Sequence, residues 1–171
     1  MILMQETILA VLEERWELYL RLLTAIVMGA LIGLERATKN KDAGVRTHSL
    51  VCLGSAAIMV LSGFSEGEYR DPMRLAAQVI SGIGFIGAGI IWMDKTSNVK
   101  RGLTTAANIW VTSGLGLIVG YGLYDIAIVT LLLMVISLNL PKMLAIVGVS
   151  RSTHNEDDHD DDMVKPKRYK G

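Results

Sequence analysis

The strongest constraint on the fold is the apolar run from Met73 to Met93. It holds about 21 residues, and its only ionisable side chain is Arg74, near the start. At 1.5 Å per residue, a helix of this length crosses the roughly 30 Å hydrocarbon core of a bilayer. The chain is 51% hydrophobic, and its mean hydropathy of +0.39 is that of an integral membrane protein. The run therefore predicts a membrane-spanning helix.

Four further apolar stretches predict a polytopic, all-α transmembrane helix bundle of about five spans. We expect the spans at about 18–34, 49–64, 73–93, 103–119 and 126–140, within one transmembrane domain over 18–149. Residues 1–17 have the pattern of an amphipathic lead-in, which lies either at the membrane interface or in solvent. They lack the succession of basic, apolar and small residues that marks a cleavable signal peptide. Residues 150–171 are too charged to build a core, so we expect a disordered tail.

Basic residues in the loops predict the orientation. The loops after the first and third spans carry seven lysines and arginines, against one in the two alternate loops. Loops rich in lysine and arginine stay in the cytoplasm. We therefore expect the N-terminus outside and the C-terminus in the cytoplasm. An impermeant thiol reagent distinguishes this from the reverse, because it should label a single cysteine at Glu68 and not one at Lys41.

Small residues recur at helical spacing in two of these spans. Such spacing lets membrane helices approach closely, so we expect helix packing there, within the chain or in a homo-oligomer. The alternative for the third span is a glycine-broken helix that forms a binding site. The predicted packing positions are Gly29, Gly33, Ala77, Ser81, Gly84 and Ala88.

Polar motifs from four spans should meet at the cytoplasmic surface. Helix N-termini and arginines there favour an anion or the carboxylate of a protein partner. The acidic side chains would pair with the arginines or hold a hydrated cation. The plainer interpretation is a set of interfacial anchors and structural salt bridges. The candidate binding residues are Glu35, Arg36, Arg46, Thr47, Asp94, Arg101, Thr104, Thr105 and Asn108.

The membrane interior offers hydroxyls and amides, among them Asn108 and Thr112, but no central acidic residue. Ion pathways usually show one, so hydrogen bonding between helices explains these groups without transport. We expect no cofactor, with Mg²⁺ as the candidate metal ion, and no nucleic-acid partner. The single cysteine, Cys52, excludes an intrachain disulfide. No catalytic motif is present, which favours a protein that is not an enzyme.

Four motifs occur in order along the chain: GALIGLER at 29–36, GVRTHSLVCLGSAA at 44–57, SGIGFIGAGII at 81–91 and VKRGLTTAANIWVTSGLGLIVGYGLY at 99–124. Together they resemble the MgtC/SapB family of bacterial inner-membrane proteins over about residues 20–140. The matching characteristic positions are Glu35, Arg36, Gly44, Arg46, Thr47, Gly82, Gly84, Gly87, Gly89, Gly102, Leu103, Thr104, Thr105, Ala106 and Trp110.

The resemblance implies a small multi-helix membrane domain linked to magnesium limitation and to virulence inside host cells. It also implies a regulator that docks on a membrane partner, such as the membrane sector of the F-type ATP synthase, where it acts as an inhibitor. The alternative is a magnesium or other divalent cation transporter or channel. Many relatives carry an ACT-like cytoplasmic domain after the last helix; with about thirty residues after Leu140, we expect none here.

Overall fold

The computed structural model describes residues 2–64, 71–93 and 100–146. It is a bundle of helices in which two short strands, β1 and β2, pair antiparallel ahead of α4. Within these described residues, five helices are long and apolar enough to cross a membrane, which confirms the predicted all-α bundle. The elements are α1 (Ile2–Thr38), α2 (Val45–Ser62), α3 (Pro72–Ile90), β1 (Trp92–Met93), β2 (Lys100–Arg101), α4 (Leu103–Tyr121) and α5 (Tyr124–Ile146).

The predicted spans and the helices differ at several of their ends. The third span ends at Ile90 rather than Met93, because the backbone becomes extended at Ile91 and the next two residues pair with β2. The lead-in and the first span form a single helix, α1, of 37 residues. The predicted disordered tail, residues 150–171, lies outside the described residues.

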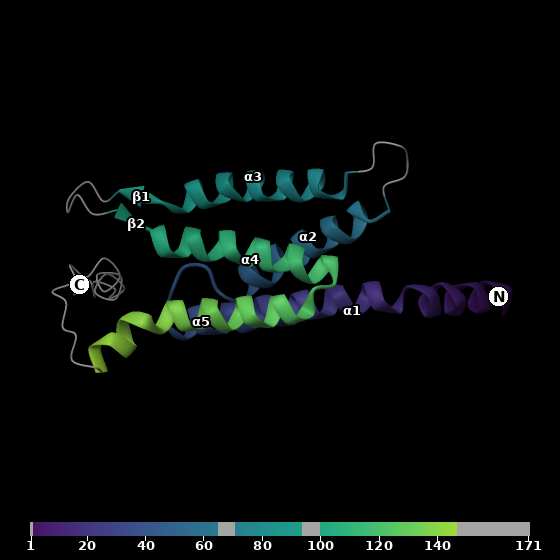
Figure 1. Ribbon diagram of the computed structural model, residues 1–171, viewed down its shortest axis with the longest axis horizontal. Helices are drawn as coiled ribbons and strands as arrows, with labels where there is room; N and C mark the ends of the chain where they lie inside the picture. Colours follow the sequence, from purple (N-terminus) through teal and green to yellow (C-terminus); the bar gives the residue numbers. More distant parts are fainter. Residues whose placement is uncertain (1, 65–70, 94–99, 147–171) are drawn as a thin grey trace, which may run out of the picture.

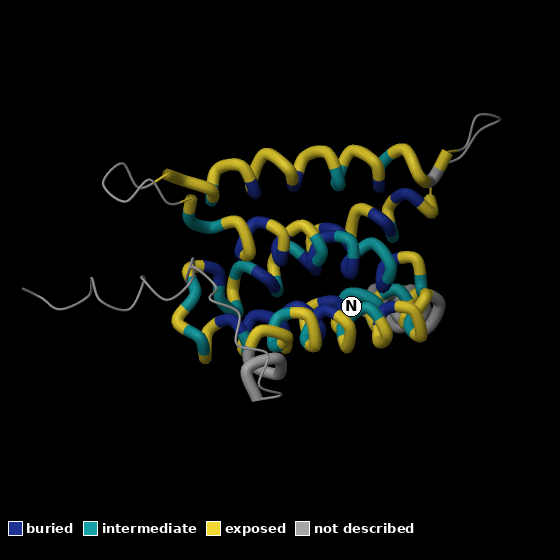
Figure 2. Tube along the Cα trace, turned by 60° about the vertical axis from the view of Figure 1, so that its left-hand side comes forward, coloured by how far each residue is buried: buried dark blue, intermediate teal, exposed yellow. Residues whose placement is uncertain are grey.

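The helices lie in layers, with α2 and α4 in the middle (Figure 1). α3 packs on one side of this pair, and α1 and α5 lie on the other. In α4, 56% of the spanning window is buried, against 11% in α3 and in α5. The buried residues accordingly line the inside of the layers in Figure 2. α4 is therefore the central helix.

Two pairs of glycines let the backbone of α2 approach its neighbours on both sides. On α1, a Cβ atom at Gly29 would lie only 2.6 Å from the carbonyl oxygen of His48, and one at Gly33 would lie 2.8 Å from the Val45 nitrogen. On α4, Gly116 and Gly120 meet α2 in the same way. Both pairs have the small-xxx-small spacing of close membrane-helix contacts. At the centre of the bundle, the backbones of α1 and α4 therefore pack directly against that of α2.

The outer surface suits a lipid environment. Large apolar side chains are exposed along α3 and α5, and Phe85 is 84% exposed. A soluble protein of this size would not show such a continuous apolar surface. The bilayer therefore covers α3 and α5. Near its end α5 bends (Figure 1), consistent with Pro141, which cannot donate the helical backbone hydrogen bond.

Candidate functional site

One end of the bundle gathers most of the polar residues that the sequence singled out. α1 ends there, α2 and α4 begin there, and the β1–β2 pair marks it on the left of Figure 1. We call it the basic end. Its charged residues in the described structure include Glu35, Arg36, Lys39, Arg46, Lys100 and Arg101.

Arg36 is the most buried charge among the described residues of the basic end. Only 3% of its surface is exposed, although a guanidinium keeps its charge in proteins. Its Nη2 donates to the Thr105 hydroxyl over 3.3 Å, while its Nε has no hydrogen-bond partner. A buried charge with so few partners is costly. The contact nevertheless ties the last turn of α1 to the first turn of α4.

Glu35 pairs with Lys39, one helical turn away, and not with an arginine as we expected. The same ammonium group donates to the carbonyl of Leu138 over 3.2 Å and to Oδ1 of Asn139 over 2.9 Å. Both charged side chains are largely shielded. This ion pair connects the end of α1 with α5. Because Lys39 neutralises the Glu35 carboxylate, that carboxylate does not balance the charge of Arg36.

A hydrogen-bonded chain links α2 to α4 just inside the basic end. Nδ1 of His48 lies 2.9 Å from the Gly44 carbonyl oxygen, and Nε2 lies 3.0 Å from Nδ2 of Asn108. Because a carbonyl can only accept, Nδ1 must carry a proton. In the neutral ring Nε2 then accepts from the Asn108 amide. Both side chains are buried, and Oδ1 of Asn108 has no partner.

Two helix N-termini add positive potential to the basic end. α2 follows Gly44 and α4 follows Gly102, and neither start has a side-chain cap. Unbonded N–H groups at such starts attract anions. Gly102 has a φ of +84°, and a Cβ atom there would overlap the carbonyl oxygen of Ile90. Only glycine fits this position, which brings the start of α4 against the end of α3.

The remaining predicted binding residues do not converge as closely. Arg46 and Thr104 are exposed, and Thr47 is half-buried. The Arg101 guanidinium carbon lies 5.6 Å from the centre of the Trp92 ring, a cation–π contact within the β1–β2 pair. Asp94 lies outside the described residues. The structure thus brings Arg36, Thr105 and Asn108 into the interior and leaves Arg46 and Thr104 on the surface.

The small residues that were predicted to pack also fall into a buried group and an exposed group. Gly29 and Gly33 lie in the contact between α1 and α2. On α3 the predicted face is exposed, and α3 instead turns a neighbouring face inward, with Ala76, Ile83 and Gly87 buried. A Cβ atom at Gly87 would lie 3.6 Å from that of Ala106 on α4. Contact with a second chain stays a prediction for the exposed residues, Ala77, Ser81, Gly84 and Ala88.

His48 is missing from the predicted site, although the sequence carries a signal for it. His48, Cys52, Ser55 and Met59 follow one another at helical spacing, and all four are buried. A histidine on the same face as core residues predicts a buried partner. Lys39 and Asn139 were also missed, because their contact joins helices about 100 residues apart in sequence.

The described residues offer little for a bound metal. In that part of the chain no three His, Cys, Asp or Glu side chains gather as ligands would. Glu35, an acid at the basic end, is held by Lys39. The arrangement suits recognition of an anionic group better than coordination of a cation.

Comparison with known proteins identifies several relatives. The sequence pattern of the MgtC family matches residues 22–152. The chain is 43% identical over 119 residues to "Putative magnesium transporter YhiD" of Escherichia coli K12, covering 66% of the chain and 54% of that protein. It is 41% identical over 143 residues to Protein SapB of Bacillus subtilis, covering 79% of the chain and 61% of that protein.

A third relative is Protein MgtC of Salmonella typhimurium LT2, which is 45% identical over 120 residues, covering 68% of the chain and 50% of that protein. The chain thus spans between 50% and 61% of the length of these three relatives. No solved structure matches the chain.

Proposed function

Since the chain belongs to the MgtC family, we propose that it is a non-enzymatic regulator that acts by docking on another membrane protein. Five spanning helices and its bacterial relatives place the chain in the inner membrane, where helical bundles rather than β-barrels reside. The family resemblance suggests a role under magnesium limitation. It also suggests the membrane sector of the F-type ATP synthase as the partner.

The observation that carries the proposal is the close packing of α1, α2 and α4 at the centre of the bundle. The glycine pairs bring α1, α2 and α4 to backbone contact, and the hydroxyls of Ser55 and Ser113 bond to each other over 2.9 Å. The acidic residues in the described spans, Glu17, Glu35 and Asp125, lie near the ends of those spans. Magnesium gives up its water reluctantly and is usually held by carboxylates, so a conducting path needs such groups or a wide wet pore.

The basic end supplies a surface for an anionic partner. Arg36 is buried with one hydrogen bond, and the uncapped starts of α2 and α4 face the same end. A carboxylate of the partner near Arg46 and Lys100, both exposed, would complement this potential. In the orientation expected from the loop charges, this surface faces the cytoplasm.

Arg46→Ala should lower recovery of the ATP synthase membrane subunits with the tagged protein by about tenfold or more, because a charge-assisted hydrogen bond contributes roughly 1.5–3 kcal/mol. It should also remove the low-magnesium growth phenotype without changing magnesium uptake. Immunoblotting of the purified complex measures recovery.

The matched control is Arg74→Ala, which removes another exposed arginine, near the start of α3 at the other end of the bundle. The control should recover the partner like the parent protein. Equal loss of recovery in both variants, or full recovery with Arg46→Ala, would contradict docking through the basic end.

The second candidate function is magnesium transport, which the name of the Escherichia coli relative supports. In that case Glu35 would act as a gate at the basic end, with its ion pair to Lys39 opening during transport. Mg²⁺ would then be the cargo, not a resident cofactor.

A further inference from the structure

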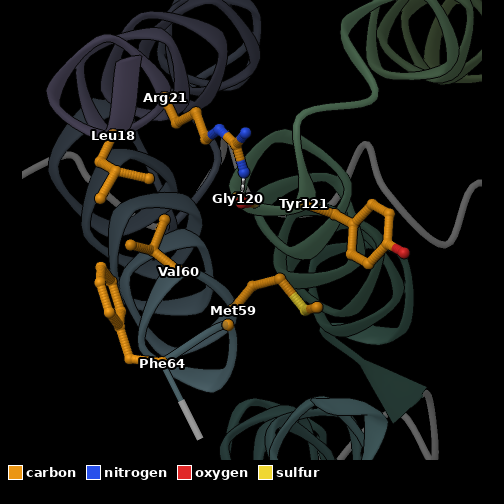
Figure 3. A pocket seen from close by; sticks show the side chains of 8 residues that line it. Leu18, Arg21, Met59, Val60, Phe64, Gly120 and Tyr121 are labelled. Carbon is orange, nitrogen blue, oxygen red and sulfur yellow. Dashed lines mark hydrogen bonds between the residues drawn. The ribbon is translucent and has the colours of Figure 1, made fainter. Parts of the chain in front are cut away.

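A cavity of about 270 Å³ lies at the end of the bundle opposite the basic end. Residues of α1, α2 and α4 line it, including Leu18, Arg21, Val60 and Tyr121 (Figure 3). We propose that this cavity binds the headgroup of an anionic phospholipid, with Arg21 contacting the phosphate. The site is independent of the docking surface at the basic end.

Arg21 is fixed in position with hydrogen-bonding capacity to spare. Its Nη1 donates to the Gly120 carbonyl oxygen over 3.0 Å, and its Nη2 pairs with Glu17 over 2.6 Å. Its Nε is buried and has no hydrogen-bond partner. A guanidinium carries five N–H groups in a planar fork that matches phosphate oxygens. These contacts hold the fork at the cavity wall, as Figure 3 shows.

The other walls suit a lipid rather than a free ion. Leu18, Met59, Val60 and Phe64 give the cavity an apolar side. The cavity lies where α2 and α4 end, which is the depth of the lipid headgroups. An amphiphile can place its phosphate at Arg21 and its acyl chain along the apolar wall. Tyr121 is half-exposed, as tyrosines at membrane interfaces often are.

The charges around the cavity favour an anionic headgroup over a zwitterionic one. The guanidinium carbon of Arg15 lies 5.4 Å from the centre of the Phe64 ring, so a second cation stands near the apolar wall. Glu17 is the acid that pairs with Arg21, and it is mostly exposed. Among the described residues, Arg15, Arg21 and Glu17 together carry a net positive charge, which the ammonium of phosphatidylethanolamine would meet unfavourably.

A purely structural role for Arg21 is the rival explanation, because its bond to Gly120 also caps the end of α4. Glu17 separates the two explanations. If Arg21 binds phosphate, Glu17 competes with the lipid for the guanidinium, and Glu17→Gln should strengthen lipid binding. If Arg21 serves only as a cap, Glu17→Gln should leave lipid binding unchanged.

Native mass spectrometry of the detergent-solubilised protein, titrated with phosphatidylglycerol, tests the proposal. We expect one retained lipid, binding about threefold tighter in Glu17→Gln and about fivefold weaker in Arg21→Lys, which keeps the charge but loses the fork. Val60→Trp should fill the cavity and abolish retention. Leu20→Trp, at an exposed position on the same turn of α1 as Arg21, should retain the lipid.

Comparison of ligands completes the test. Phosphatidylethanolamine and diacylglycerol should bind more weakly than phosphatidylglycerol, and inorganic phosphate should not displace the lipid. Equal retention by Val60→Trp, or equal binding of diacylglycerol, would overturn the site. Displacement by inorganic phosphate alone would show an anion site without a lipid and would equally overturn the proposal. None of these outcomes bears on the partner recovered through the basic end.

Discussion

Gly116→Ala is expected to lower the free energy of unfolding of the bundle by about 1–3 kcal/mol, the usual cost of overpacking a tight core. A Cβ atom at Gly116 would overlap the carbonyl oxygen of Cys52 and lie 2.8 Å from the Cβ atom of Ser55. Both obstacles belong to α2 and are close to its backbone, so they cannot rotate away. α2 and α4 must separate, which also strains the Ser55–Ser113 hydrogen bond.

Gly114→Ala is the matched control on the same helix, because a Cβ atom there meets nothing within 4 Å. Alanine favours a helix over glycine by about 0.8–1 kcal/mol in water, so this variant should be neutral or slightly more stable. Thermal unfolding in detergent compares the two variants. Melting temperatures that fall equally would show that the glycine pair of α4 does not set the distance to α2.

Asn108→Leu is expected to destabilise the protein by about 1–2 kcal/mol, because it leaves Nε2 of His48 buried without a donor. Hydrogen bonds between membrane helices contribute about 0.6 kcal/mol on average and up to about 1.7. The upper part of that range applies here, since both side chains are buried and their bond is 3.0 Å long. His48→Phe should lower the free energy of unfolding by a similar amount, because it leaves the buried amide of Asn108 without its acceptor.

The double variant His48→Phe with Asn108→Leu should recover most of the loss, because both polar partners are replaced by apolar groups. A double-mutant cycle on melting curves in detergent gives the coupling energy. Thr104→Val, at an exposed position one turn before Asn108, serves as the control and should have little effect. Strictly additive losses would show that the hydrogen bond contributes nothing to the packing of α2 on α4.

The number and nature of the helices could be predicted from the sequence, because a membrane span needs a long apolar run and little else. Which faces of the helices contact one another could not be predicted. On α3, small residues occur on two neighbouring faces, so spacing alone could not decide between Gly84, which is exposed, and Gly87, which is buried. α3 packs on α4 through the face that carries Gly87, since Gly87 contacts Ala106.

The candidate site shows the same division. That Arg36 and Thr105 lie at one end follows from span order, and they form a hydrogen bond. The partner of Glu35 does not follow, because a lysine one turn away competes with the arginines of other loops. The pairing of Trp92 with Arg101 was equally hidden, since an apolar run does not reveal where a helix stops and the backbone extends.

The most direct test of the central claim, that this protein docks and does not conduct, is magnesium flux into liposomes that contain only the purified protein. A magnesium-sensitive dye inside the liposomes reports uptake, and a magnesium ionophore confirms that the dye responds. We predict uptake no faster than in empty liposomes, because α1, α2 and α4 pack at backbone contact and the acidic residues of the described spans lie near the ends of those spans. Saturable uptake that Glu35→Gln or Asp94→Asn reduces would contradict the account and would make the basic end an ion gate.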